Sequence, residues 1–361
     1  MNQAKRLTGA LALAAALVGC GGGGKDAGDP PFADPAASSP TGGVGGSPTI
    51  PTGPAGGVSN VSNSVASQRF MSISVETYNL DWSFDGKTTK VQVFAADTAG
   101  NPIADGTVIQ FSTEGGQIVT SCRTTGIASG TSVISGCSVD FNTQDFRPND
   151  GFARIIAWMI GEEAYKDLNA NGKYDQGEPF LDSGRIFRDD DDSGNYSSNF
   201  DELVVGATLV NEPGIGTAGC ASLTNLPTNV PNVNEIPLSV DNTCDGVWGP
   251  TLIRRTVVLP VSDPRLMGVE ATDGGVYVFS DTSFTVDRST VEKPAAPSGT
   301  TIAVANAPLG CTVSVTPTTV ANAITATRHF ISGVGTCSGQ SVLVSATFTG
   351  RPPATTTYTF P

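Results

Sequence analysis

The side chains best suited to chemistry are gathered in one acidic stretch, residues 161–202. In its first half, oxygen-bearing side chains stand at positions 1, 3, 5, 9 and 12 of a twelve-residue segment, with glycine at position 6 and a backbone carbonyl available at position 7. In order, these residues are Asp167, Asn169, Asn171, Gly172, Lys173, Asp175 and Glu178. Calcium takes six to eight oxygen ligands, and the glycine permits the turn that brings them around one ion. The spacing therefore predicts a calcium site; the alternative is a solvated acidic loop.

The second half of the stretch repeats this pattern less completely. Positions 1, 3, 5, 6, 7 and 9 are filled by Asp189, Asp191, Ser193, Gly194, Asn195 and Ser197. Position 12 is Phe200, so a closing carboxylate must come from Asp201 or Glu202. The four consecutive aspartates, residues 189–192, would repel one another without a cation among them. A second ion is predicted here, with its ligand set left open.

The charge of the whole chain is concentrated in the same stretch. It holds 12 acidic and 4 basic side chains, a net charge of −8, whereas the chain as a whole carries −14. This distribution indicates local cation chemistry rather than a generally acidic protein. Asp182 lies between the two segments and could bridge them, and Glu162 and Glu163 could supply further ligands.

The elements that must position these loops are β-strands. From about Phe70 onward, short alternating apolar runs are separated by turn residues, as in Lys90–Ala95 and Gly106–Thr113, which is typical of an all-β sandwich. We expect a first sandwich domain over residues 69–261, carrying the insert 161–202 and a long loop, 211–250. The insert follows a predicted strand, Phe152–Ile160, and not a helix, so an ion there should stiffen the fold rather than switch it. Further strands are expected at 203–210 and 252–261.

One part of this first domain resembles a known family. The segment VQVFAADTAGNPIADGTVIQFSTEGGQI, residues 91–118, is similar to the bacterial immunoglobulin-like domains of the invasin and intimin type (Big-1-like), and residues 137–159 match more loosely. The resemblance implies an immunoglobulin-like β-sandwich in which Gly100, Asn101, Pro102 and Gly106 set turns. The acidic insert resembles segments of some bacterial lipoproteins with such domains, and its loops resemble EF-hand loops without the flanking helices.

The end of the chain repeats features of this segment. A proline-containing turn followed by Gly-Thr and an alternating strand occurs at Gly106-Thr107 and again at Gly299-Thr300. We therefore expect a second, smaller immunoglobulin-like domain over residues 262–361.

The N-terminus has the pattern of a targeting segment. Lys5 and Arg6 precede a short apolar run, residues 7–18. The run ends in the sequence Leu17-Val18-Gly19-Cys20. This pattern resembles a bacterial lipoprotein signal, which implies cleavage after residue 19, lipidation of Cys20 and, with Gly21 next, an outer-membrane anchor. An ordinary secretory signal with a chance cysteine is the alternative. Residues 20–68 are rich in Gly, Pro and Ser and are expected to form a disordered tether.

The cysteines agree with export. Six remain without Cys20, and neighbouring pairs give the simplest of fifteen pairings: Cys122–Cys137, Cys220–Cys244 and Cys311–Cys337. Such bonds fit an oxidising compartment. A zinc site is disfavoured because the sequence has no C-x-x-C pair and only one histidine.

The sequence holds no familiar catalytic motif. The single histidine, His329, has no companion motif and is expected at a surface or strand edge. The low isoelectric point and the lack of a basic stripe argue against a nucleic-acid partner. We therefore expect a non-enzymatic envelope lipoprotein whose calcium-stabilised domains act as a spacer or adhesion module. The alternatives are a calcium-dependent glycan- or protein-binding module, or an accessory subunit of an enzyme.

Overall fold

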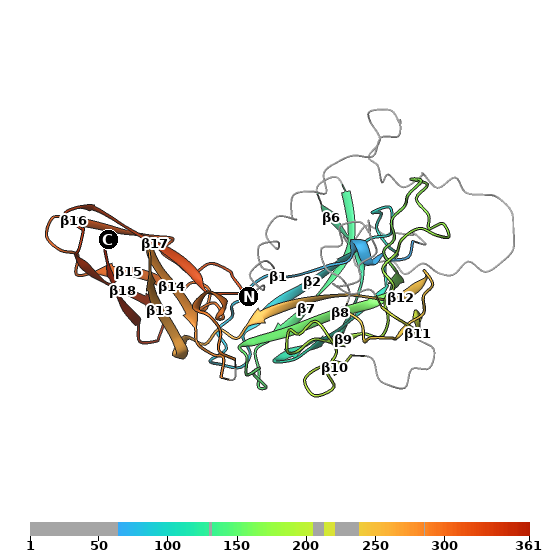
Figure 1. The fold of residues 1–361 in the computed structure, drawn as a ribbon, viewed down its shortest axis with the longest axis horizontal. Helices are drawn as coiled ribbons and strands as arrows, with labels where there is room; N and C mark the ends of the chain where they lie inside the picture. Colours follow the sequence, from blue (N-terminus) through green and yellow to red (C-terminus); the bar gives the residue numbers. More distant parts are fainter. Residues whose placement is uncertain (1–63, 130–131, 205–212, 221–237, 285) are drawn as a thin grey trace, which may run out of the picture. The chain divides into compact units, whose positions relative to one another are not determined.

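A computed structural model describes residues 64–129, 132–204, 213–220, 238–284 and 286–361. In these ranges the fold is all-β, as predicted, with antiparallel sheets joined by turns and three short 3-10 segments (Figure 1). The 3-10 segments are η1 (Gln68–Phe70), η2 (Pro264–Leu266) and η3 (Thr290–Glu292). The predicted signal peptide, the lipidation site Cys20 and nearly all of the predicted tether lie outside the described residues.

Two sheets form the first sandwich. One sheet has the order β1-β2-β7-β4, with β6 also paired to β7; the other has the order β12-β8-β3-β5. Their bounds are β1 (Ser72–Val75), β2 (Thr88–Ala95), β3 (Val108–Thr113), β4 (Gln117–Ile118), β5 (Ser121–Arg123), β6 (Thr125–Ser129), β7 (Ser132–Asn142), β8 (Phe152–Glu162) and β12 (Pro250–Pro260). Alternate residues from both sheets, such as Val91, Val93, Ile109 and Phe141, share one buried apolar cluster.

β8 is buried on both faces, which explains why its sequence is almost continuously apolar. Ala153, Ile155 and Ala157 face the core between the sheets. On the other face, Ile156 and Trp158 pack with Ile186 of the acidic insert in a separate buried cluster. β8 pairs along its whole length with β12 (Figure 1). The insert therefore covers the outer face of the longest strand pair of this sandwich.

Two further sheets follow along the chain. One has the order β13-β14-β17-β16 and the other β15-β18-β19. Their bounds are β13 (Met267–Thr272), β14 (Gly275–Ser280), β15 (Thr301–Ala305), β16 (Cys311–Thr316), β17 (Thr327–Gly335), β18 (Ser341–Thr347) and β19 (Ala354–Thr359). Val276, Ile302, Val344 and Tyr358 belong to their common apolar cluster.

His329 was expected at a surface or a strand edge, and this prediction is wrong. Its side chain on β17 is fully buried. Nδ1 lies 2.7 Å from the carbonyl oxygen of Pro317 and Nε2 lies 2.9 Å from the hydroxyl of Thr327. Both ring nitrogens therefore have partners inside the protein, so a buried neutral imidazole is satisfied without solvent.

All three predicted cysteine pairs are confirmed as disulfides. Cys122 on β5 joins Cys137 on β7 and so links the two sheets of the first sandwich. Cys311 on β16 joins Cys337, and Cys220 joins Cys244 within the predicted loop 211–250. That loop also contains a strand, β11 (Ile215–Ala218), in its described part. Disulfides of this kind fit an extracytoplasmic protein.

Residues 66–71, near the start of the described chain, form a strap against the middle of β12 and the end of β8. Gln68 is fully buried; its amide nitrogen donates to the carbonyl of Arg254, and its amide oxygen accepts from the nitrogen of the same residue, at 2.8 and 2.9 Å. Arg255 donates to the carbonyls of Gln68 and Met71. The nitrogen of Glu162 donates to the carbonyl of Ala66 at 2.7 Å. The strap is thereby bonded to both β12 and the end of β8. Among the described residues, no helix is long and apolar enough to cross a membrane.

Candidate metal centres

Both acidic segments form loops closed by short antiparallel ladders. Around the first loop, Tyr165 pairs with Phe180 and the nitrogen of Lys166 donates to the carbonyl of Pro179 at 2.8 Å. Around the second, β9 (Phe187–Arg188) pairs with β10 (Glu202–Leu203). Continuing each register one step inward places Asp167 opposite Glu178, and Asp189 opposite Asp201. The second loop is thus flanked by strands and the first by an isolated β-bridge, and neither loop has a helix at its flanks.

In the first loop, backbone nitrogens donate hydrogen bonds to side chains of the same loop. The Asp167 carboxylate accepts from the nitrogens of Asn171 and Gly172 at 3.2 and 2.6 Å. Asn169 Oδ1 also accepts from Asn171 N, at 3.0 Å. Positive φ values occur at positions 4, 6 and 11: Ala170 (φ 60°), Gly172 (φ 77°) and Gly177 (φ 101°). The carboxylates of this loop do not form a cluster as close as the one found in the second loop, which is the one close group of acidic side chains among the described residues.

The second loop has the same internal scaffold. The Asp189 carboxylate accepts from the nitrogens of Ser193 and Gly194, at 3.0 and 2.8 Å, and Asp191 accepts from Ser193 N at 3.0 Å. The left-handed residues are again at positions 4 and 6, Asp192 (φ 56°) and Gly194 (φ 73°). Two segments of different sequence therefore share the same backbone turns over positions 1 to 6.

The closing carboxylate, which the sequence left open for the second loop, makes the same backbone hydrogen bonds in both loops. Glu178 accepts from the nitrogens of the residues at positions 2 and 9, Leu168 and Asp175, at 2.7 and 2.9 Å. Asp201 accepts from the nitrogens of the residues at positions 2 and 9 of its own loop, at 2.9 and 2.6 Å. Glu202 instead forms an ion pair with Arg188 at 2.9 Å. Asp201 thus does in the second loop what Glu178 does in the first.

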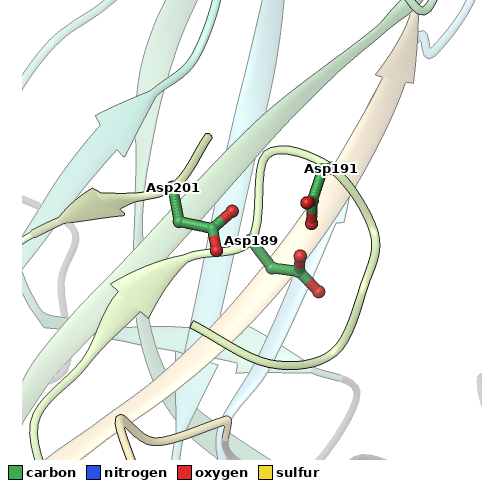
Figure 2. A group of neighbouring side chains, drawn as sticks. All are labelled: Asp189, Asp191 and Asp201. Atoms are coloured by element: carbon green, nitrogen blue, oxygen red, sulfur yellow. The ribbon is translucent and has the colours of Figure 1, made fainter. Parts of the chain in front are cut away.

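Three carboxylates converge in the second loop. One oxygen each from Asp189, Asp191 and Asp201 lies within 4.8 Å of the others, and Figure 2 shows the three side chains turned toward a common space. Burial, with repulsion from Asp201 and other neighbouring acids, raises the pKa of Asp189 to about 6. The hydroxyl of Ser193 lies 2.8 Å from the carbonyl of Asn195, so two more of the predicted ligand oxygens are adjacent. This set of hard oxygens suits calcium chemistry.

The four consecutive aspartates make two kinds of contact. Asp189 and Asp191 face the carboxylate cluster, whereas Asp190 and Asp192 pair with buried arginines. Arg188 bonds both oxygens of Asp190 at 2.6 and 2.8 Å.

Arg154 of β8 forms an ion pair with Asp192. Its side chain is 1% exposed and contacts Asp192 at 2.5 Å, Asp150 at 2.6 Å and Glu114 at 3.0 Å. Neither arginine was among the residues predicted for the site. Arg188 could have been suspected because it directly precedes the acidic run, but Arg154 lies 35 residues earlier within an apolar strand.

The first loop is docked through aromatic side chains. Tyr174, at position 8, stacks on Trp248 with ring centroids 4.6 Å apart, and Tyr165 meets both rings edge-on. Trp248 Nε1 donates to the carbonyl of Glu163 at 3.0 Å. Within the loop, the amide nitrogens of two predicted ligands, Asn169 and Asn171, both donate to Asp175 Oδ2. The side chains of three predicted ligands therefore already meet in the structure.

Asp182 is not a member of the three-aspartate group. One of its oxygens accepts from the nitrogen of Gly246 at 2.8 Å, and burial raises the pKa of its carboxyl. Glu163 is 1% exposed and accepts from Ser183 N at 2.7 Å. Burial raises the pKa of Glu163 to about 9, so its carboxyl carries a proton at neutral pH. The role of Asp182 as a bridge between ions stays a prediction.

Comparisons with known proteins identify no relative of this chain: no family model, no curated protein and no solved structure matches it. The case for function therefore depends on the geometry of the two loops and on the sandwich that carries them.

Proposed function

We propose that this protein is a non-enzymatic cell-envelope lipoprotein whose immunoglobulin-like domains are stiffened by two calcium ions and act as a spacer or adhesion module. The observation that carries the proposal is the common scaffold of the two loops. In each, the position 1 carboxylate accepts from positions 5 and 6, and the closing carboxylate accepts from positions 2 and 9. A scaffold repeated on different sequences favours a shared ligand over a chance acidic turn.

The ions would act on the fold through neighbouring contacts. The first loop holds Tyr174 against Trp248, and the second is bonded to β8 through Asp192 and Arg154. An ion that neutralises the clustered carboxylates would remove the repulsion that otherwise opposes these positions. The proposed effect is therefore rigidity of the insert and of the outer face of β8.

The remaining parts of the proposal have separate supports. Three disulfides favour an exported protein. The outer-membrane anchor is inferred from the sequence around Cys20, and the immunoglobulin-like family from the resemblance of residues 91–118. The spacer or adhesion role is inferred by analogy with what such sandwiches commonly do.

The experiment is a thermal melt of the full chain in EDTA, in millimolar calcium and in millimolar magnesium. An ion that binds only the folded state raises the unfolding midpoint. We expect calcium to raise it by several degrees and magnesium to raise it less, because magnesium demands a stricter octahedral geometry. Asp167→Ala with Asp189→Ala should remove the calcium effect, whereas Asp273→Ala with Asp140→Ala, which removes the same charge outside the loops, should retain it. Equal midpoints in EDTA and calcium would refute the calcium proposal.

A second candidate function is calcium-dependent binding of a glycan or protein. It is favoured by two exposed apolar side chains beside the aromatic stack: Leu168, in the loop that carries Tyr174, and Val247, next to Trp248, are 61% and 65% exposed. A glycan array probed with calcium and with EDTA tests this candidate, and signals that are absent in both conditions, or equal in both, count against it.

A further inference from the structure

Asn171 and Gly172 form the one Asn-Gly step in the sequence. At such a step, the backbone nitrogen of the glycine can attack the side-chain carbonyl carbon of the asparagine. A bond forms between that nitrogen and Cγ, the Cγ–Nδ2 bond breaks, and the amide leaves as ammonia with the proton from the backbone nitrogen. Water then opens the five-membered ring at either of two C–N bonds, giving aspartate or isoaspartate. Glycine favours the attack because it has no Cβ to obstruct the nitrogen.

In the first loop, both reacting groups, the Gly172 nitrogen and the Asn171 side-chain amide, form hydrogen bonds. The nitrogen of Gly172 donates to Asp167 Oδ2 at 2.6 Å. The side chain of Asn171 is fixed at both ends: Oδ1 accepts from Lys173 N at 2.8 Å, and Nδ2 donates to Asp175 Oδ2 at 2.7 Å. The side chain of Asn171 is nevertheless exposed, so water reaches it.

Closure of the loop opposes the reaction in two ways. The nucleophile must lose its proton, and the negative Asp167 carboxylate that accepts this proton's hydrogen bond disfavours the loss. The side chain must also rotate to present Cγ, which breaks two hydrogen bonds. The reaction should therefore proceed from an opened loop, and its rate should follow the fraction of molecules in which the loop is open.

We propose that Asn171 is a deamidation site gated by the first loop, suppressed while the loop is closed and released when it opens. The product isoaspartate lengthens the backbone by one carbon between positions 5 and 6, which is incompatible with the hydrogen bonds that Asp167 makes there. The modification would thus disable the loop permanently. Gating by closure rests on the geometry of the loop alone, whereas an effect of calcium on the rate rests on the proposed function.

The test is peptide mass mapping of the full chain after prolonged incubation at pH 8 in EDTA or in calcium. The peptide containing Asn171 gains about one mass unit on conversion, and the two products separate by retention time. The same chain in guanidinium chloride gives the ungated rate. Asp167→Ala removes the acceptor of the Gly172 N–H, and Asp189→Ala makes the same change in the other loop as a control.

We expect conversion at residue 171 in EDTA to be at least several-fold slower in the folded chain than in guanidinium chloride, and Asp167→Ala to restore most of the difference. With calcium at about ten times its dissociation constant, the rate should fall by about a further tenfold, because the open fraction falls by that factor. A folded chain that reacts as fast as the denatured one, or an Asp167→Ala rate no higher than that of Asp189→Ala, overturns the gating. Equal rates in calcium and EDTA, with Asp167→Ala still faster, would support the gating and count against calcium binding in this loop.

Discussion

At the scale of single residues, the second loop depends on which carboxylate closes it. Asp201 stands one residue later than the template position, and its side chain is one methylene shorter than glutamate. These two differences compensate, so its oxygens meet the nitrogens of the residues at positions 2 and 9, as those of Glu178 do in the first loop. The neighbouring acid, Glu202, is engaged by Arg188 and is 60% exposed at its side chain.

Asp201→Asn should therefore abolish calcium binding in the second loop while leaving the first intact. In calorimetric titration, we expect two bound calcium ions in the unmodified chain and one in the variant. Glu202→Gln is the matched control and should retain two. If Glu202→Gln loses an ion and Asp201→Asn does not, the assignment of the closing ligand is wrong.

A second prediction at this scale concerns Glu163. Its pKa is raised to about 9 by burial, so the folded protein keeps a proton that the unfolded chain releases above its ordinary pKa near 4.5. Stability contributed by this proton is present at low pH and is lost as pH rises toward 9.

Glu163→Gln imitates the protonated form in being uncharged and able to donate a hydrogen bond at every pH tested. We expect the unfolding midpoint of this variant to fall less between pH 6 and pH 9 than that of the unmodified chain. The measurement is a series of thermal melts in EDTA, which keeps calcium affinity from contributing to the trend. Parallel pH profiles would show that the carboxyl is already ionised in the folded protein.

At the scale of elements, the insert is a structural layer as well as a candidate ion site. Ile186 is fully buried against Ile156 and Trp158 on the outer face of β8. Arg154, also on this face, bonds the second loop. Apolar packing and an ion network therefore hold the same segment to the same strand.

Ile186→Ala should destabilise the protein by about 2–4 kcal/mol, the usual range for removing a buried isoleucine side chain. The control is Ile160→Ala on β8, where the side chain is 63% exposed and the change should cost less than about 0.5 kcal/mol. Guanidinium denaturation in constant calcium measures both. Equal losses would contradict a packing role for the insert.

Much of this arrangement could be predicted from local pattern. The alternation of residues 90–95 and 106–113 predicts strands because side chains alternate between faces, and Asp167 to Glu178 fit a template with fixed spacing. The pairing of Arg154 with Asp192 could not be predicted, because it depends on how the insert folds back over β8. The burial of His329 was also missed, since one polar residue in a strand does not show which face it occupies.

At the scale of the whole molecule, two buried groups with shifted pKa values, Glu163 and His329, lie in different sandwiches and make stability depend on pH in opposite directions. Glu163 follows β8 in the first sandwich, and its contribution to folding stability is greatest at low pH. His329 lies on β17, where burial lowers its pKa. Because the folded protein resists protonating this imidazole, the unfolded chain binds more protons below about pH 6.5, and stability falls as pH decreases through that range.

We therefore expect acid to loosen the sheets of residues 267–359 through His329. Amide hydrogen exchange of β14 and β17 in the full chain should accelerate between pH 7 and pH 5 beyond the intrinsic effect of pH. His329→Gln, which cannot become charged, should reduce this acceleration even where it lowers stability overall. An unchanged acceleration in the variant would exclude the imidazole as its cause.

The strap of residues 66–71 gives the protein a definite response to pulling from its N-terminal side. Ser67 bridges Glu162 in parallel, and Gln68 and Met71 are bonded to β12. Because these bonds reach two strands, tension on the preceding chain would be passed to both β8 and β12. The β8–β12 pair behind the strap would then bear the load as a unit, so mechanical extension should begin only when that whole group of bonds fails.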